Sequence, residues 1–297
     1  MEKKTQRITK GVIAVAGSGT RFLPVTKTLP KEMLPIVDKP IVQYVAEEMV
    51  QAGITDIIFV TRADKKILED YFDHNTLLED ELREAEKWKE LEEIKRISNM
   101  ANFIYIRQKG PYGNGTPVLN ASSIIGDEPF IFAYGDDLVK SKVSFTKQLI
   151  ENYERNHAVV LGCQEVLEEE VPLYGIIKLK PDSSMMEIEK IIEKPLPEDV
   201  PSRLAAFGRF VLVPEICKIL QKFSQKPKSE IGKGGELWLT DAIEEYIRRG
   251  NKVVVQPVQD GRWYTTGDPL HFLEVTLQYA LDREDVGPVL RKFLKSL

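Results

Sequence analysis

The feature that most constrains the fold is the alternation of short apolar runs with longer helical patterns along the first half of the chain. Largely β-branched runs suited to buried strands recur over residues 12–16, 56–61, 103–107 and 130–134. Between them, the spacing of apolar residues predicts helices over 41–51, 65–72, 77–97 and 118–125. This alternation predicts an α/β fold with a mostly parallel sheet flanked by helices. Functional side chains of such sheets gather beyond the carboxyl ends of the strands.

The second half predicts strands that follow one another more closely, over 158–164, 175–179, 187–193, 207–213 and 253–258. Short connections favour antiparallel neighbours, so we expect antiparallel additions to the sheet. A helix is predicted to begin near Thr240, where Asp241 and Glu244 have the spacing of an N-capping pair. The chain is predicted to end in helices over 269–281 and 286–294, which could pack on the core or on a second subunit. No repeat or low-complexity linker divides the 297 residues, so we expect one domain.

Composition and charge indicate which kinds of partner and compartment to expect. A net charge of −5, from 41 basic and 46 acidic side chains, argues against a nucleic-acid partner, although a few local cations can still bind a small anion. No apolar stretch is long enough to span a bilayer, so we expect no membrane partner. Cys163 and Cys217 have no C-x-x-C spacing, and we predict reduced core thiols in a cytoplasmic protein.

A glycine-containing loop follows the first predicted strand. Gly17 and Gly19 would let the backbone approach a phosphate or a base, and Arg21 and Lys31 follow on the same proline-punctuated loop. A long loop inside a compact domain is usually functional. Two cations that converge on a polyphosphate are what transfer at phosphorus requires. An ordinary glycine-rich turn with solvated cations is the alternative, which the shared loop makes less favourable.

These motifs resemble the nucleotidyltransferase signature of bacterial-type UDP-glucose pyrophosphorylases. The similarity runs along almost the whole chain and includes Gly17-Ser18-Gly19-Thr20-Arg21, Pro30-Lys31-Glu32-Met33-Leu34-Pro35, Gly135-Asp136-Asp137, Glu193-Lys194-Pro195 and Leu239-Thr240-Asp241-Ala242-Ile243. It implies a Rossmann-like nucleotidyltransferase fold over 1–297. It also implies a nucleotide-binding half (1–140), a sugar-binding half (141–262) and C-terminal helices (263–297) available for contact between subunits of a homodimer or homotetramer.

The resemblance implies which residues bind the nucleotide. Arg21 and Lys31 would bind the triphosphate, and Gln108 would pair with the edge of the uracil, helped by the backbone of Gly113. Glu32 would lie beside the nucleoside. The other implied contacts, made mainly by the loop backbone to the base and ribose, are those of Ala16, Gly17, Gly19 and Thr20.

The resemblance also implies which residues bind the metal ion and the sugar phosphate that accepts the nucleotidyl group. Asp136 would ligate Mg²⁺, Glu193 would accept hydrogen bonds from glucose hydroxyls, Lys194 would grip the sugar phosphate, and Gly175 would offer its backbone to the sugar. The implied catalytic residues are Arg21, Lys31, Asp136 and Lys194. From the residues alone, Asp136 could instead cap a following helix, and Glu193 with Lys194 could be a surface pair of little energetic value.

The implied reaction joins UTP and glucose 1-phosphate to give UDP-glucose and pyrophosphate. The acceptor phosphate is already ionised, so no general base is needed, and positioning with charge neutralisation supplies the catalysis. Two alternatives remain: the same chemistry with dTTP or another hexose 1-phosphate, and a catalytically silent nucleotide-sugar-binding subunit.

The chain departs from the family pattern at two places. Thr265 stands where the family usually has a metal-binding Asp, and Asp268 is the nearest substitute, so we expect weaker metal affinity rather than lost activity. Gly113-Asn114-Gly115-Thr116-Pro117 replaces a more apolar segment near the expected base pocket, which leaves the preference for uracil over thymine more open.

Overall fold

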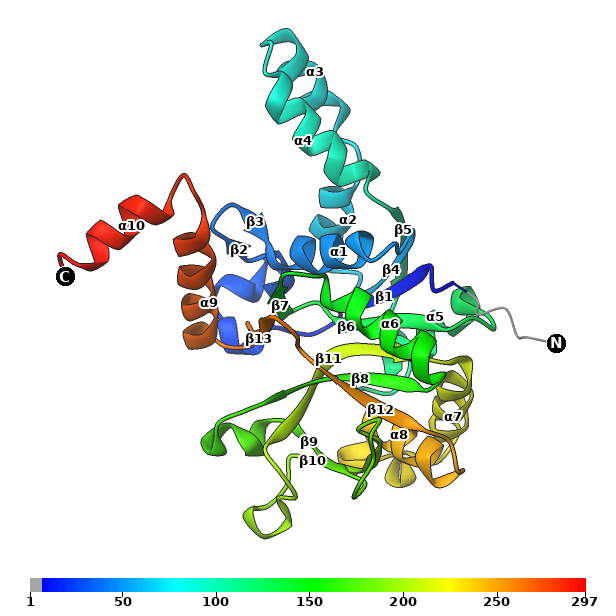
Figure 1. The fold of residues 1–297 in the computed structure, drawn as a ribbon. Helices are drawn as coiled ribbons and strands as arrows, with labels where there is room; N and C mark the ends of the chain where they lie inside the picture. Colours follow the sequence, from blue (N-terminus) through cyan, green and yellow to red (C-terminus); the bar gives the residue numbers. More distant parts are fainter. Residues whose placement is uncertain (1–6) are drawn as a thin grey trace.

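The computed structural model describes residues 7–297, which are built around a nine-stranded mixed sheet (Figure 1). The strand order is β10-β9-β11-β6-β1-β4-β5, and β8 joins β12 to β11. The parallel core consists of β1 (Lys10–Ala14), β4 (Asp56–Thr61), β5 (Asn102–Arg107) and β6 (Phe130–Tyr134). These strands confirm the α/β prediction made from the alternation in the first half.

The predicted antiparallel additions are also confirmed. β11 (Leu204–Leu212) runs antiparallel to β6, β8 (Val159–Glu165) and β9 (Gly175–Leu179). β10 (Ile188–Glu193) pairs antiparallel with β9, and β12 (Val253–Pro257) pairs parallel with β8. The long strand β11 therefore joins the two halves of the chain into one sheet.

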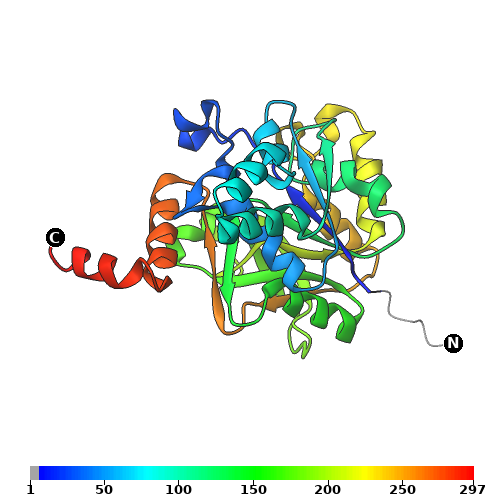
Figure 2. The ribbon, with the colours of Figure 1, turned by 90° about the horizontal axis from the view of Figure 1, so that it is seen from above.

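Helices cover both faces of the sheet (Figures 1 and 2). They are α1 (Ile41–Gln51), α2 (Lys66–Phe72), α5 (Thr116–Ile125), α6 (Phe145–Asn156), α7 (Pro214–Ser224) and α8 (Leu239–Arg248). Val12 and Ile13 of β1 are fully buried in two separate apolar clusters, because successive side chains of a strand point to opposite faces. Full burial of each such side chain contributes roughly 1.5–3 kcal/mol, which explains why apolar runs mark the central strands.

The single helix predicted over 77–97 is wrong. The segment forms a hairpin of α3 (Thr76–Glu84) and α4 (Trp88–Asn99) that projects from the body (Figure 1). Glu86 has a left-handed φ of 55°, and the Lys87 N–H donates to Leu82 O at 2.9 Å, which closes the first helix. A charged residue occupies the position that glycine usually marks, so the sequence pattern shows no break.

The predicted capping pair of Asp241 and Glu244 is also wrong. Helix α8 begins at Leu239, so Asp241 already lies in its first turn. The Leu239 N–H instead donates to Oδ1 of Asn114 at 2.7 Å. A side chain 125 positions away replaces the local cap, and this leaves Asp241 to line a cavity.

Smaller elements complete the described residues. β7 (Asp137–Ser141) pairs with β13 (Gly261–Thr265), and β2 (Pro35–Ile36) pairs with β3 (Lys39–Pro40). The two predicted C-terminal helices are present as α9 (Pro269–Asp282) and α10 (Gly287–Leu294), and α10 extends away from the body (Figure 1). Short 3₁₀ turns occur at Thr20–Phe22, Val25–Lys27, Lys31–Met33, Glu168–Leu173, Pro197–Asp199, Lys228–Glu230 and Lys233–Gly235. Between residues 7 and 297, no helix has the length and apolar character needed to cross a bilayer.

Candidate active site

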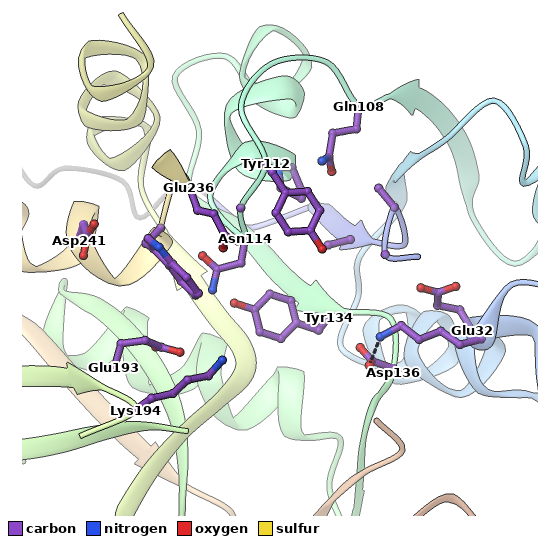
Figure 3. A pocket seen from close by; sticks show the side chains of 17 residues that line it. Glu32, Gln108, Tyr112, Asn114, Tyr134, Asp136, Glu193, Lys194, Glu236 and Asp241 are labelled. Carbon is purple, nitrogen blue, oxygen red and sulfur yellow. Dashed lines mark hydrogen bonds and ion pairs between the residues drawn. The ribbon is translucent and has the colours of Figure 1, made fainter. Parts of the chain in front are cut away.

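A cavity of about 790 Å³ lies at the carboxyl ends of the parallel strands (Figure 3). Gln108 follows β5, Asp136 follows β6, and Glu193 and Lys194 stand at the end of β10. Parallel strands end at the same edge of a sheet, so Gln108 and Asp136 meet there, whereas Glu193 and Lys194 reach the cavity on the antiparallel strand β10, whose last residue pairs with Gly175 at the start of β9. The predicted site residues in the wall are Ala16, Gly17, Lys31, Glu32, Gln108, Gly113, Asp136, Glu193 and Lys194.

The other predicted residues lie outside this wall. Gly175 lines an adjoining chamber of about 190 Å³ that it shares with Glu193 and Asp136. It is the strand partner of Glu193, and a Cβ at Gly175 would lie 3.1 Å from Oε2 of Glu193. The Glu193 carboxylate therefore lies over a glycine that leaves room for it. Gly19, Thr20, Arg21 and Asp268 do not line either space.

The loop between β1 and α1 is held together by its own turns. Gly19 has a φ of 64°, which favours glycine, and its carbonyl accepts a hydrogen bond from Thr26 Oγ1 at 2.7 Å. Arg21 is exposed, and its guanidinium donates to Gly267 O at 3.4 Å. The neighbouring Thr266 donates its Oγ1 hydrogen to the carbonyl of Asp136 at 2.6 Å. Arg21 thus lies beside the segment that is bonded to the Asp136 backbone.

The central charged contact of the cavity is the ion pair of Lys31 with Asp136. Burial alone would lower the pKa of Lys31, but the carboxylates of Asp136 and Glu32 outweigh it and raise that pKa. Burial would raise the pKa of Asp136, and the Lys31 ammonium reverses the direction. Both groups are therefore charged, and the lysine neutralises the aspartate in the cavity.

A second, more deeply buried pair lies behind the first. Lys65 Nζ donates to Glu32 at 2.9 Å and to Val15 O at 2.6 Å, so it joins the loop to the end of β1. Burial raises the pKa of Glu32 and lowers the pKa of Lys65. The sequence pattern predicts only that Lys65 begins a helix, and no local pattern marks its partner 33 positions earlier.

Asp136 and Asp137 are adjacent in sequence but have different surroundings. Asp136 lines the cavity, whereas Asp137 is buried and accepts a hydrogen bond from Gly208 N at 2.9 Å. Burial and the neighbouring Asp136 charge raise the pKa of Asp137 to about 7. Strand β7, not a helix, follows the pair, so the helix-cap alternative for Asp136 is excluded.

A buried arginine supports this turn from behind. Arg209 is completely buried and donates to Asp137 O at 2.7 Å and to Tyr134 O at 3.2 Å. Its charge is balanced by Glu48 of α1, with Arg209 Nε and Glu48 Oε1 3.2 Å apart. The guanidinium therefore bonds carbonyls on both sides of Asp136 and holds the turn in place.

The acceptor end contains Glu193 and Lys194. Burial raises the pKa of Glu193, Lys194 opposes the shift, and Asp241 adds to it. Lys194 has a left-handed φ of 48° and lies over the ring of Trp238, with 5.9 Å between Nζ and the ring centroid. Several other residues of the wall were not predicted to bind substrate, and these are Tyr112, Asn114, Tyr134, Glu236, Trp238 and Asp241.

The unusual segment after Gln108 is bonded to the chain before α8. Leu237 N donates to Tyr112 O at 2.7 Å, and Gly115 N donates to Leu237 O at 2.8 Å. Gly113 has a φ of 135°, and a side chain there would overlap the Leu237 backbone. With the Asn114 cap on Leu239, these bonds form an inter-loop clamp between residues 112–115 and 237–239.

The residues of the cavity fit a metal ion that takes only part of its ligands from the protein and the rest from substrate and water. No group of three or more acidic, histidine or cysteine residues suited to a metal occurs among residues 7–297. Mg²⁺ commonly takes one or two carboxylates and completes its shell with water and phosphates, so Asp136 can suffice. Asp268 uses Oδ1 to cap α9 at Leu270 N and His271 N and Oδ2 to contact His271. The structure therefore gives no support to Asp268 as a second ligand.

Comparison with known proteins agrees with this geometry. The model of the nucleotidyl transferase family matches residues 10–281. The UTP–glucose-1-phosphate uridylyltransferase of Bacillus subtilis (strain 168) is 42% identical over 293 residues, which cover 98% of each chain. The UTP-bound UGPase from Acinetobacter baumannii is similar with a TM-score of 0.87 and 33% identity, covering 98% of this chain and all of that one. The structure of a UDP-glucose pyrophosphorylase complexed with UDP-glucose is similar with a TM-score of 0.81 and 38% identity. The similarity covers 93% of this chain and 100% of that one.

Proposed function

The chain belongs to the nucleotidyl transferase family, and from this premise we propose that it transfers a uridylyl group from UTP to glucose 1-phosphate. The products are UDP-glucose and pyrophosphate. The observation that carries the proposal is a single cavity that contains both the Lys31–Asp136 pair and, on another part of its wall, Glu193 with Lys194. Two anionic substrates need cations at both ends of such a cavity.

In the proposed complex, the nucleotide lies against residues of the 1–140 half. Gln108 and the backbone of Gly113 would contact the uracil, while Ala16 and Gly17 would leave room for the base and ribose. The sugar would lie against the 141–262 half, with Glu193 over its hydroxyls and Gly175 behind it. Support comes from the cavity wall, to which both halves contribute.

Lys31 has two roles in this proposal. Before substrate binds, its ammonium neutralises Asp136, and with UTP present it would turn to the phosphates, assisted by Arg21. Lys194 would hold the acceptor phosphate so that one of its oxygens attacks the α-phosphorus opposite the leaving pyrophosphate. Mg²⁺ held by Asp136 and the phosphates would supply charge neutralisation at the phosphate oxygens. Alignment of two bound reactants can contribute roughly 7–11 kcal/mol.

Because the transfer is direct, we expect sequential kinetics. No covalent uridylyl-enzyme is part of the proposal, so labelled pyrophosphate should not exchange into UTP unless glucose 1-phosphate or UDP-glucose is present. Exchange with UTP and Mg²⁺ alone would contradict the direct transfer.

The test is pyrophosphate release across a grid of nucleoside triphosphates and hexose 1-phosphates with Mg²⁺. We expect the highest kcat/KM for UTP with glucose 1-phosphate. A higher value with dTTP or another sugar would replace the named substrates while keeping the reaction. Absence of turnover with every pair, in a protein that still binds UTP, would favour a silent binding subunit.

We also propose that the protein is a cytoplasmic homodimer or homotetramer. Both cysteines are free and buried, which suits a reducing compartment. The segment 263–297 carries exposed apolar side chains suited to a subunit contact: Leu270, Leu273, Val289, Phe293 and Leu294. Light scattering on the full chain and on a Phe293→Ser variant tests the assembly, and a monomeric wild type would reject it.

A further inference from the structure

We infer that Trp238 is a positioning residue for Lys194 and thereby tunes the affinity for the sugar phosphate. The inference deepens the proposed function and rests on it for the identity of the ligand. The contact between Trp238 and Lys194 can be tested without any substrate, so the two ideas fail separately. Neither residue type nor spacing marks Trp238 in the sequence, because the role depends on a neighbour 44 positions earlier in the chain.

The first observation is that the Lys194 ammonium lies over an aromatic face. Nζ is 5.9 Å from the centroid of the Trp238 ring, within the range in which the ring quadrupole attracts a cation. Both residues line the main cavity, where Figure 3 shows the Lys194 side chain directed across the open space. Lys194 itself is exposed, so little else in the protein restricts its four-carbon stem.

The second observation concerns the backbone from which this side chain departs. Lys194 has a φ of 48° and precedes Pro195, a combination that side-chain-bearing residues adopt only where the surroundings hold it. The Lys194 N–H donates to Tyr174 O at 3.0 Å, which supplies part of that restraint. The strained residue directs its Cα–Cβ bond into the cavity, and the indole then limits where the ammonium can go.

The third observation is that the chain on both sides of Trp238 is hydrogen-bonded to the loop 112–115, which belongs to the half proposed to bind the nucleotide. Trp238 stands between Leu237 and Leu239, and both of these residues are bonded by the inter-loop clamp. The clamp loop begins a few residues after Gln108, the residue proposed to bind the base. A continuous set of contacts therefore runs from the base end, through the clamp and Trp238, to Lys194.

Competing charges explain why Lys194 needs such a neighbour. Glu193, Glu236 and Asp241 all line the same cavity, and each could draw the ammonium away from the acceptor phosphate. An aromatic face attracts the cation without neutralising it, so the charge remains available when the phosphate arrives. Trp238 would thus keep Lys194 ready for substrate and away from the acidic wall.

The substrate-free test uses tryptophan fluorescence. The emission of Trp238 is obtained as the difference between wild type and Trp238→Phe, and it is then measured in a Lys194→Met background. We expect Lys194→Met to change the intensity or wavelength of this difference spectrum. Lys178→Met is the matched control, because Lys178 forms an exposed ion pair with Glu189, lines neither of the two cavities that Trp238 lines and should leave the emission unchanged. An unchanged spectrum in Lys194→Met would overturn the contact.

The functional test is a double-mutant cycle on glucose 1-phosphate binding, measured calorimetrically with a non-reactive UTP analogue present. Trp238→Leu should weaken glucose 1-phosphate about two- to five-fold, as expected for an exposed cation–π contact, and leave the UTP analogue unaffected. In the Lys194→Met background the same substitution should have no further effect. Trp238→Phe should restore part of the affinity.

Two outcomes of the cycle would refute the inference. One is an equal loss from Trp238→Leu in both backgrounds, which would mean that Trp238 acts independently of Lys194. The other is an equal loss of UTP analogue affinity, which would indicate general damage to the cavity. If wild type binds no hexose 1-phosphate at all, the proposed function fails instead, and the fluorescence result still decides the contact.

Discussion

Lys31 forms an ion pair with Asp136 inside the cavity, although the two residues are 105 positions apart in the chain. One comes from the loop after β1 and the other from the turn after β6, and these strands are neighbours in the sheet. The pair places a cation where the proposal requires magnesium and phosphate to meet. Substrate binding would then exchange one set of charges for another within an existing site, without creating a new buried charge.

Asp136→Asn tests this site most directly. Loss of the carboxylate charge should lower kcat/KM by at least about 100-fold and raise the Mg²⁺ concentration needed for half-maximal rate. Asp137→Asn is the matched control, because an amide oxygen can still accept the Gly208 N–H hydrogen bond, so we expect a loss below about 10-fold. Steady-state kinetics at varied Mg²⁺ distinguishes the two variants, and equal losses would contradict the assignment.

Thr265→Asp tests the departure from the family pattern. Thr265 is the strand partner of Asp137, so a carboxylate there would stand near Asp136. We expect a lower Mg²⁺ requirement in this variant than in wild type, measured by titration of the rate and by direct binding of Mn²⁺.

Asp268→Ala is the companion to that experiment. Loss of the cap on α9 should cost about 1 kcal/mol of unfolding free energy while the Mg²⁺ requirement stays the same. An increase in the Mg²⁺ requirement would restore Asp268 as a candidate ligand.

Arg209→Met tests the support behind the turn. Removal of the buried guanidinium leaves Glu48 without its charged partner and should lower the free energy of unfolding by about 3–5 kcal/mol. Urea denaturation monitored by circular dichroism measures the loss. Lys178→Met breaks an exposed cross-strand pair with Glu189 and should cost under about 1 kcal/mol. Similar losses of unfolding free energy from both variants would show that the buried Arg209–Glu48 pair contributes no more to stability than an exposed ion pair.

Glu193 should make substrate affinity depend on pH. Burial raises its pKa, so in the folded protein it becomes protonated as pH falls through a value above its ordinary range. Affinity for glucose 1-phosphate should then decrease over that window in wild type. Glu193→Gln should retain only the titration of the phosphate itself, so the ratio of the two KM profiles isolates the carboxylate.

The raised pKa of Glu193 also makes the stability of the folded protein depend on pH. Substrate affinity should fall as pH falls, whereas the stability contributed by this residue falls as pH rises. The folded state binds the Glu193 proton more tightly than the unfolded chain does. The resulting stabilisation is fully present at pH values below the pKa of Glu193 in the unfolded chain. It is lost as the pH rises through the higher pKa that Glu193 has in the folded protein. Unfolding free energies of wild type and Glu193→Gln should therefore diverge with rising pH, and a constant difference would contradict the shift.

Glu86→Gly should stabilise the protein. Glu86 has a φ of 55° at the turn between α3 and α4, a conformation that costs a residue with Cβ about 1–2 kcal/mol and costs glycine little. Glycine loses more backbone entropy on folding, so we expect a net gain of about 0.5–1 kcal/mol in thermal or urea unfolding. Glu81→Gly, at an exposed position inside α3, should instead destabilise.

Local patterns predicted the strands of the nine-stranded sheet and most helices because burial imposes a period on each of them, whereas the short strands outside that sheet and helices α6 and α7 were not predicted. Val12 and Ile13 must face opposite apolar layers, and that requirement is visible in five consecutive residues. The break at Glu86 and the start of α8 escaped prediction for the complementary reason. One depends on a left-handed residue that is not glycine, and the other on a cap from Asn114.

The sequence by itself determined the strands of the nine-stranded sheet, most of the helices, the glycine loop with its cations, and the motifs that identify the family, because each depends on residues that are neighbours in the chain. Only the tertiary structure decided that Lys31 neutralises Asp136, that Asp137 is buried beside it, and that Arg209, Lys65 and Trp238 take part. The physical reason is that charge pairing and burial act over distances of a few ångströms, and folding brings those distances about between residues that no local pattern connects.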